Sequence, residues 1–214
     1  KAKPVFAPFD VSQVGEKPFA GLFVDPHHRK ESDLFEAMFS EAAGTIPIAK
    51  GMFGTPCVGA TVFADGANSS LLQNILSPLA DAEEVYVCGS VVGGTGAGVM
   101  HKLIGEIRRY YRKGEMYGVF MLPWFQVSGG GGPGTINDAL ISRNAKHGIQ
   151  YFYDHTISKL LDASILIGYP DGKQTKVLTP LTLSDGQRGE SPHYLHLAAV
   201  YGFLSLKQAK THQK

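Results

Sequence analysis

The chain has 214 residues, which is enough for one domain with a large hydrophobic core. Its 20 lysine and arginine residues nearly balance 19 acidic residues, so the formal net charge is only +1. No block of like charge stands out, and the sequence therefore gives no indication of a nucleic-acid partner or a membrane-surface partner.

The cysteines and the first residue give expectations about the cellular compartment of the protein and about the extent of its domain. Cys57 and Cys88 match no metal or redox spacing, and we expect both thiols to be reduced and structural, which favours an intracellular, cytoplasmic protein. The longest nearly apolar run, residues 117–125, is too short to span a bilayer, and no signal-peptide pattern is present. Because residue 1 is not methionine, we expect residues 1–214 to form a single domain cut from a longer polypeptide and incomplete at both ends.

The N-terminal third predicts few regular elements. Apolar side chains at helical spacing in residues 31–43 predict one helix, with Ser32 as its N-cap and Gly44 as its stop. Residues 46–59 are rich in glycine and proline and are expected to form a connector. Residues 61–64 are expected to end a strand.

The centre of the chain has the pattern strand, glycine turn, helix. A turn and a helix over residues 69–80 come first. Residues 85–87 are a short β-branched and aromatic run that suits a buried strand. Residues 89–98 hold five glycines, and apolar side chains recur at helical spacing through residues 99–109.

Four further elements follow. Continuous apolar runs predict buried strands at residues 117–125 and 163–168. Residues 126–135 are expected to form a flexible loop, and Asn137 is expected to begin a helix that runs to about Leu161. The last helix opens at Ser191 and is apolar on nearly every side, which is typical of a buried helix.

Alternating strands and helices, with each strand a continuous apolar run, predict an α/β fold. We expect a three-layer, Rossmann-like domain with a mainly parallel sheet between helices. Ligands in such folds bind at the carboxyl ends of the strands. Those ends would carry residues 89–98, 123–134 and 169–172.

The glycine turn is the strongest candidate for a binding site. Glycines let a ligand approach the backbone closely, because no Cβ stands in the way. A helix that starts at the turn directs its unpaired N–H groups and the positive end of its dipole at the ligand. Proteins hold phosphate groups in this way.

The sequence of the turn differs from each of three known glycine motifs. A Walker loop needs a lysine and a Ser/Thr after the glycines, and a hydrolase elbow needs G-x-S-x-G; neither is present. Gly94, Gly96 and Gly98 run G-x-G-x-G, where a dinucleotide fingerprint has G-x-G-x-x-G. A Rossmann-like dinucleotide-dependent enzyme stays open as an alternative.

Residues 93–98 resemble the GGGTG[ST]G signature of the tubulin and FtsZ family of GTP-binding proteins, and look closest to the divergent bacterial tubulin-like proteins. Val92 stands at the first glycine of that signature, and Ala97 stands at its last Ser/Thr. The flanking sequence agrees, because a G-A-N turn at residues 66–68 and a helix precede the signature strand. The resemblance covers residues 63–206 and implies the nucleotide-binding fold of that family.

The resemblance also implies roles for individual residues. Backbone N–H groups of the glycine turn would hold the α- and β-phosphates, with the Thr95 hydroxyl as a side-chain donor. The candidate residues of this turn are Gly93, Gly94, Thr95, Gly96, Ala97 and Gly98. Gly66, Ala67 and Asn68 would face the γ-phosphate. Asp171 would lie near the ribose and base, where the family has a guanine-reading asparagine, so the choice of guanine over adenine stays open.

The implied ligand is GTP or GDP, with Mg²⁺ bound through the nucleotide. The nucleotide of this family sits between subunits, so the resemblance implies self-association through the nucleotide face. The family's water-activating acidic loop is absent from these residues, so nucleotide binding is predicted and hydrolysis is expected only in a longer parent. A degenerate scaffold that keeps the fold and binds no nucleotide is a further hypothesis.

Overall fold

The computed structural model describes residues 18–22, 29–48, 52, 54–64, 69–127, 137–168, 176–178 and 194–211. Its centre is a parallel sheet with strand order β1-β2-β4, in which Glu84 pairs with Glu115 and Tyr117 pairs with Ala163. The strands are β1 (Glu84–Ser90), β2 (Glu115–Met121) and β4 (Ala163–Ile167). The predicted α/β class with a parallel sheet is confirmed.

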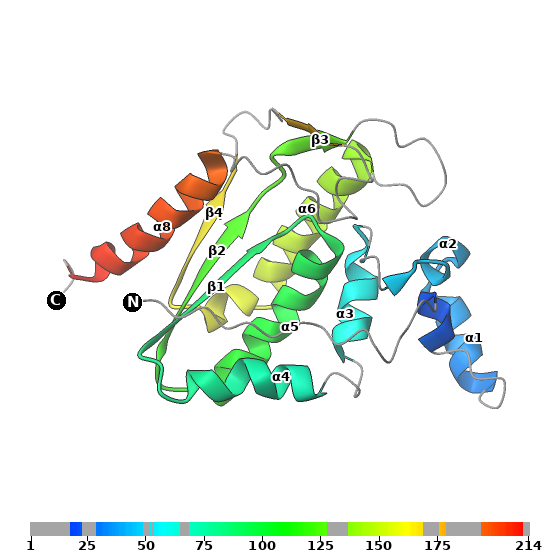
Figure 1. Ribbon diagram of the computed structural model, residues 1–214, viewed down its shortest axis with the longest axis horizontal. Helices are drawn as coiled ribbons and strands as arrows, with labels where there is room; N and C mark the ends of the chain where they lie inside the picture. Colours follow the sequence, from blue (N-terminus) through cyan, green and yellow to red (C-terminus); the bar gives the residue numbers. More distant parts are fainter. Residues whose placement is uncertain are drawn as a thin grey trace.

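Helices cover both faces of this sheet. Helices α5 (Gly94–Tyr110) and α6 (Asp138–Asp154) lie on one face, and α8 (Tyr194–Thr211) lies on the other (Figure 1). Successive residues of β2 point to opposite faces, so Phe120 packs in the core with α5 and α6 while Val119 packs in the cluster under α8. The result is the expected three-layer arrangement.

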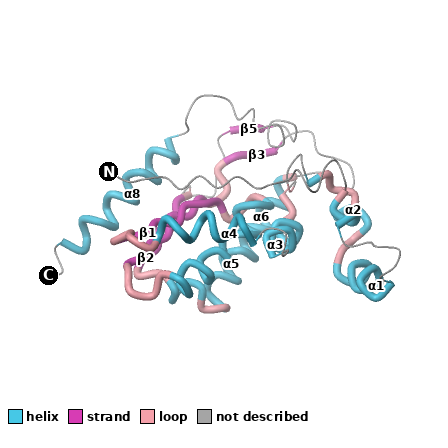
Figure 2. The backbone as a smooth tube through the Cα atoms, turned by 60° about the horizontal axis from the view of Figure 1, so that its bottom comes forward, coloured by secondary structure: helices cyan, strands magenta, loops and turns pink. Residues whose placement is uncertain are grey.

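The remaining elements surround these layers. They are α1 (Arg29–Met38), α2 (Glu41–Gly44), α3 (Pro56–Ala64), α4 (Ser69–Leu76), the 3-10 helices Phe19–Leu22, Ser77–Leu79 and Ile157–Leu160, and the strands β3 (Phe125–Val127) and β5 (Lys176–Leu178). Strands β3 and β5 form a separate parallel pair beyond the main sheet (Figure 2). No helix in the described part of the chain combines the length and apolarity that a membrane span needs.

The N-terminal elements depart from prediction in two places. The single helix expected over residues 31–43 is two helices, because the Ser40 side chain caps α2 by accepting a hydrogen bond from the Ala43 N–H (3.3 Å). The strand end expected at residues 61–64 is the last turn of helix α3. Pro56, the first residue of α3, fits there because a first-turn residue needs no N–H partner.

Two long segments are also divided where one element was expected. The run 117–125 belongs to two strands of different sheets, because Pro123 has no N–H to continue the ladder of β2. The helix expected to reach Leu161 ends at Asp154, and Thr156 follows in the left-handed region with φ of 60°. Its predicted start is confirmed, because the Asn137 side chain caps α6 by accepting from the Leu140 N–H (2.9 Å).

Helix α8 is not buried on all sides as expected. Its inner face meets the sheet, where the Phe203 ring lies 3.9 Å from the Tyr86 ring between centroids. Burial is the largest of the causes that raise the pKa of Tyr86 to about 12. The outer face is open, with large apolar side chains exposed at helical spacing. These side chains are Leu197, Val200, Tyr201 and Leu204.

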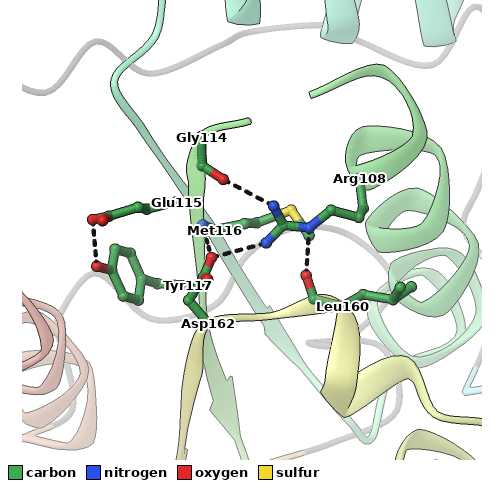
Figure 3. Close-up of polar contacts among 7 residues, drawn as sticks. All are labelled: Arg108, Gly114, Glu115, Met116, Tyr117, Leu160 and Asp162. Atoms are coloured by element: carbon green, nitrogen blue, oxygen red, sulfur yellow. Dashed lines mark hydrogen bonds and ion pairs between the residues drawn. The ribbon is translucent and has the colours of Figure 1, made fainter. Parts of the chain in front are cut away.

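The far end of α5 is fixed to the sheet by Arg108 (Figure 3). Its guanidinium donates to the carbonyl oxygens of Leu160 (2.6 Å) and Gly114 (2.8 Å) and to the Asp162 carboxylate (2.9 Å). The same carboxylate oxygen accepts from the Met116 N–H (2.8 Å). One side chain thus joins α5 to the start of β2 and to the segment that leads into β4.

We expect Arg108→Met to lower the free energy of unfolding by about 1 to 3 kcal/mol, because it removes the donor to two carbonyl groups and one of the two donors to the Asp162 carboxylate. Urea unfolding measures this loss. Arg109→Met is the matched control: Arg109 is 72% exposed and pairs only with Glu106 among the described residues. That control should change stability by less than about 0.5 kcal/mol, and equal losses in both variants would refute the role of Arg108.

Candidate functional site

The candidate site is the turn between β1 and α5, at the carboxyl end of β1. Gly93 is the N-cap of α5, with extended φ and ψ of −85° and 158°, and no side chain caps the helix there. The first intrahelical bond runs from the Ala97 N–H to the Gly93 carbonyl (3.0 Å). The geometry is therefore the predicted strand, turn and helix, with a helix of 17 residues behind the turn.

The first N–H groups of α5 have no hydrogen-bond acceptor among the described residues. Those of Gly94, Thr95 and Gly96 precede the first intrahelical bond, and no described residue accepts from them. They lie at the positive end of the helix dipole, and the Thr95 side chain is exposed beside them. The first eight residues of α5 have no acidic or basic side chain other than His101. An anion at the turn would be met mainly by backbone groups.

Two glycines of the turn, Gly94 and Gly98, are explained by close packing against α3 and the segment in front of it. A Cβ on Gly94 would lie 2.7 Å from the Met52 carbonyl oxygen, and a Cβ on Gly98 would lie 2.8 Å from the Ala60 nitrogen. From the side of α3, a Cβ on Gly59 would collide with the Gly94 carbonyl. Helices α3 and α5 are in backbone contact, and side chains at these positions would force them apart.

Gly96 and Gly93 differ in the space around them. A Cβ on Gly96 would lie 2.6 Å from the Ser90 carbonyl oxygen, so the turn itself requires glycine there. The Ser90 hydroxyl also accepts from the Val92 N–H (3.2 Å), which tightens the same turn. A Cβ on Gly93 would meet no atom within 4 Å. Gly93 is therefore the glycine of this turn at which ligand approach can be tested without a clash.

The segment in front of α3, which lies in the connector predicted for residues 46–59, forms a second wall of the site. Gly54 has a left-handed backbone (φ 67°), and its carbonyl accepts a hydrogen bond from the Asn144 side chain of α6. Gly148 of α6 brings that helix against the turn, since a Cβ there would lie 3.4 Å from the Val91 carbonyl. The dipeptide Thr55-Pro56 indicates the start of α3 in the sequence. Threonine is common at helix N-caps, and proline is common at the first helical position.

The structure brings together one part of the predicted site. The six candidates from Gly93 to Gly98 form the turn and the first turn and a half of α5. Gly66, Ala67 and Asn68, predicted to face the γ-phosphate, lie outside the described residues, as does Asp171. Cys57 and Cys88 are free and exposed, and burial of part of its surface raises the pKa of the Cys88 thiol.

No family model matches the chain, and no curated protein matches it. Among solved structures, the chain is similar to CetZ from Methanosaeta thermophila strain DSM 6194, with 22% identity and a TM-score of 0.43 over 64% of this chain and 33% of that one. This chain thus spans about a third of the length of that structure. A likeness at this TM-score decides neither family nor function.

The packing of the turn predicts opposite effects for two glycine-to-alanine changes in α5. Gly98→Ala should lower the free energy of unfolding by about 1 to 3 kcal/mol, because its Cβ overpacks the contact with α3. Gly105→Ala should raise it by about 0.5 to 1 kcal/mol, since no atom lies within 4 Å of that Cβ position and alanine favours the helix. Urea unfolding of both variants measures this difference, and a stable Gly98→Ala protein would contradict the proposed contact.

Proposed function

We propose that the turn between β1 and α5 binds the phosphate groups of a nucleotide, as in a GTP-binding domain of the tubulin/FtsZ type. The observation that carries the proposal is the uncapped N-terminus of α5, whose first N–H groups have no acceptor among the described residues beside the open position at Gly93. Its place at the carboxyl end of a strand in a parallel sheet also supports the proposal.

The ligand we favour is GTP or GDP with Mg²⁺. The first turns of α5 bring no lysine or arginine to the turn, so a polyphosphate would need charge neutralisation from elsewhere, and a nucleotide-bound Mg²⁺ supplies it. In this proposal the turn formed by Gly93, Gly94, Thr95, Gly96, Ala97 and Gly98 holds the α- and β-phosphates, chiefly through the N–H groups of Gly94, Thr95 and Gly96. Gly66, Ala67 and Asn68 face the γ-phosphate, and Asp171 lies near the base. A second copy of the chain associates through the nucleotide face, and residues 1–214 form one domain.

A second candidate is a scaffold of the same fold that binds no nucleotide. The specific observation in its favour is that packing alone accounts for Gly94, Gly96 and Gly98. A glycine pattern with that explanation needs no ligand. The two candidates separate on binding, and they cannot be separated by substitutions that disturb the packing.

We expect GTP with Mg²⁺ to raise the midpoint of thermal unfolding of the purified chain. Ligand at 100 times its Kd stabilises by about 2.7 kcal/mol, which corresponds to about 5 to 10 °C for a chain of this size. Parallel titrations with ATP and NAD, each with and without Mg²⁺, identify the base and the ligand class. A rise with NAD alone would favour the dinucleotide enzyme, and no rise with any ligand would favour the scaffold.

Gly93→Ser is the variant that tests the turn directly. A serine N-cap accepts from the N–H groups of the helix that it precedes, so unliganded stability should rise by a few tenths of a kcal/mol. The same hydroxyl occupies the N–H groups proposed to hold phosphate, and nucleotide affinity should fall at least about tenfold, or about 1.4 kcal/mol. Isothermal titration calorimetry measures the affinity, with Gly105→Ala as a control that should bind normally. Unchanged affinity in Gly93→Ser would exclude this turn as the phosphate site.

A further inference from the structure

A cluster of rings joins α5 to α6 beside the turn. The His101 ring of α5 lies 4.9 Å from the Tyr151 ring of α6 and 6.2 Å from the Phe152 ring, between centroids. Tyr151 in turn stacks on His155, the C-cap residue of α6, with centroids 4.1 Å apart. Tyr151 therefore lies between an imidazole of α5 and an imidazole at the end of α6.

His101 makes this contact sensitive to protonation. Its Nδ1 atom is buried and has no hydrogen-bond partner among the described residues. In the neutral ring with the proton on Nε2, Nδ1 has only a lone pair, and leaving it unpaired is a modest cost. A protonated ring carries an N–H at Nδ1 with a positive charge and no acceptor, which is a much larger cost in a buried position.

Among the described residues, no group of opposite charge acts on the pKa of His101. Burial is the largest cause that lowers the pKa of His101, and the charge of His155 lowers it further. Of the other elements packed against α5, α3 has no acidic or basic side chain, and the 3-10 helix Ile157–Leu160 brings only the exposed Lys159. The Glu84 carboxylate of β1 accepts a hydrogen bond from Tyr86, toward the face covered by α8.

We propose that His101, Tyr151 and His155 form a proton-sensitive contact between α5 and α6, which loosens when the His101 imidazole, whose Nδ1 atom is buried, becomes charged. The effect reaches the candidate site through α6, because Asn144 holds the Gly54 carbonyl and Gly148 lies against Val91. Acidification thereby loosens the contacts that α6 makes with Gly54 and with Val91. This inference does not depend on which ligand the turn binds.

The sign of the pH dependence follows from the lowered pKa. Near neutral pH His101 is uncharged in both the folded and the unfolded chain, and its contribution to stability is fully present. As the pH falls below the ordinary histidine value of about 6.5, the unfolded chain takes up the proton first, and stability is lost down to the lowered pKa of the folded state. Each pH unit in that window raises the unfolding equilibrium constant about tenfold.

The test compares urea unfolding of the wild-type chain and His101→Phe at pH 7.5 and pH 5. Between pH 7.5 and pH 5, we expect the unfolding equilibrium constant to rise more in the wild type than in His101→Phe. The extra rise should be about tenfold for each pH unit by which the pKa of His101 in the folded chain lies below its ordinary value. His147→Gln, which removes an exposed histidine of α6, should behave like the wild type. Hydrogen exchange, corrected for its intrinsic pH dependence, should show faster opening of α6 at pH 5 in the wild type and not in His101→Phe.

A second measurement keeps the proposal testable if His101→Phe does not fold. An NMR titration of the imidazole signals reports the pKa of His101 in the wild type and in His155→Gln. We expect a value below the ordinary range in the wild type and a shift toward that range in His155→Gln. Equal loss of stability in wild type and His101→Phe, or an ordinary pKa for His101, would overturn the proposal.

Discussion

The backbone contact between α3 and the first turns of α5 is the constraint on which the candidate site depends. Because Gly59, Gly94 and Gly98 present no side chains there, the helices approach until backbone atoms touch, and the segment in front of α3 comes to lie against the turn after β1. Helix α6 then joins both pieces through Asn144 and Gly148. Three segments far apart in the sequence thereby form one corner of the molecule.

Helix α5 transmits this constraint to the sheet. Its N-terminal end is held by contact with α3, and its C-terminal end is held by hydrogen bonds from Arg108 to carbonyl groups at the start of β2 and before β4. Between these ends, Ile104 is fully buried in the core cluster with Met116 and Phe120. A helix fixed at both ends and packed along its length cannot slide, so the turn keeps its position relative to the carboxyl ends of the strands.

The sequence predicts the parts of this fold that depend on local pattern. Apolar runs predict β1, β2 and β4, and the predicted start of α6 at Asn137 is confirmed. The errors occur where one residue decides between two structures: Ser40 divides a helix, and Pro123 divides a strand. Helix α3 was missed because its glycine and its apolar surface have meaning only beside α5, a tertiary contact that periodicity does not encode. For the same reason the sequence predicts the glycine turn and does not show that the segment in front of α3 lies against it.

The packing role of the glycines has a consequence for how such chains diverge. If a descendant of this protein lacked the proposed ligand binding, selection on stability alone would still keep small residues at positions 59, 94 and 98, because larger side chains there would push α5 away from α3 and from the segment in front of it. Position 93 would be released from that pressure, since its side chain would face open space. Among homologues, most of the glycine signature would therefore persist without the proposed nucleotide binding. Variation at position 93 would distinguish the chains that do not bind.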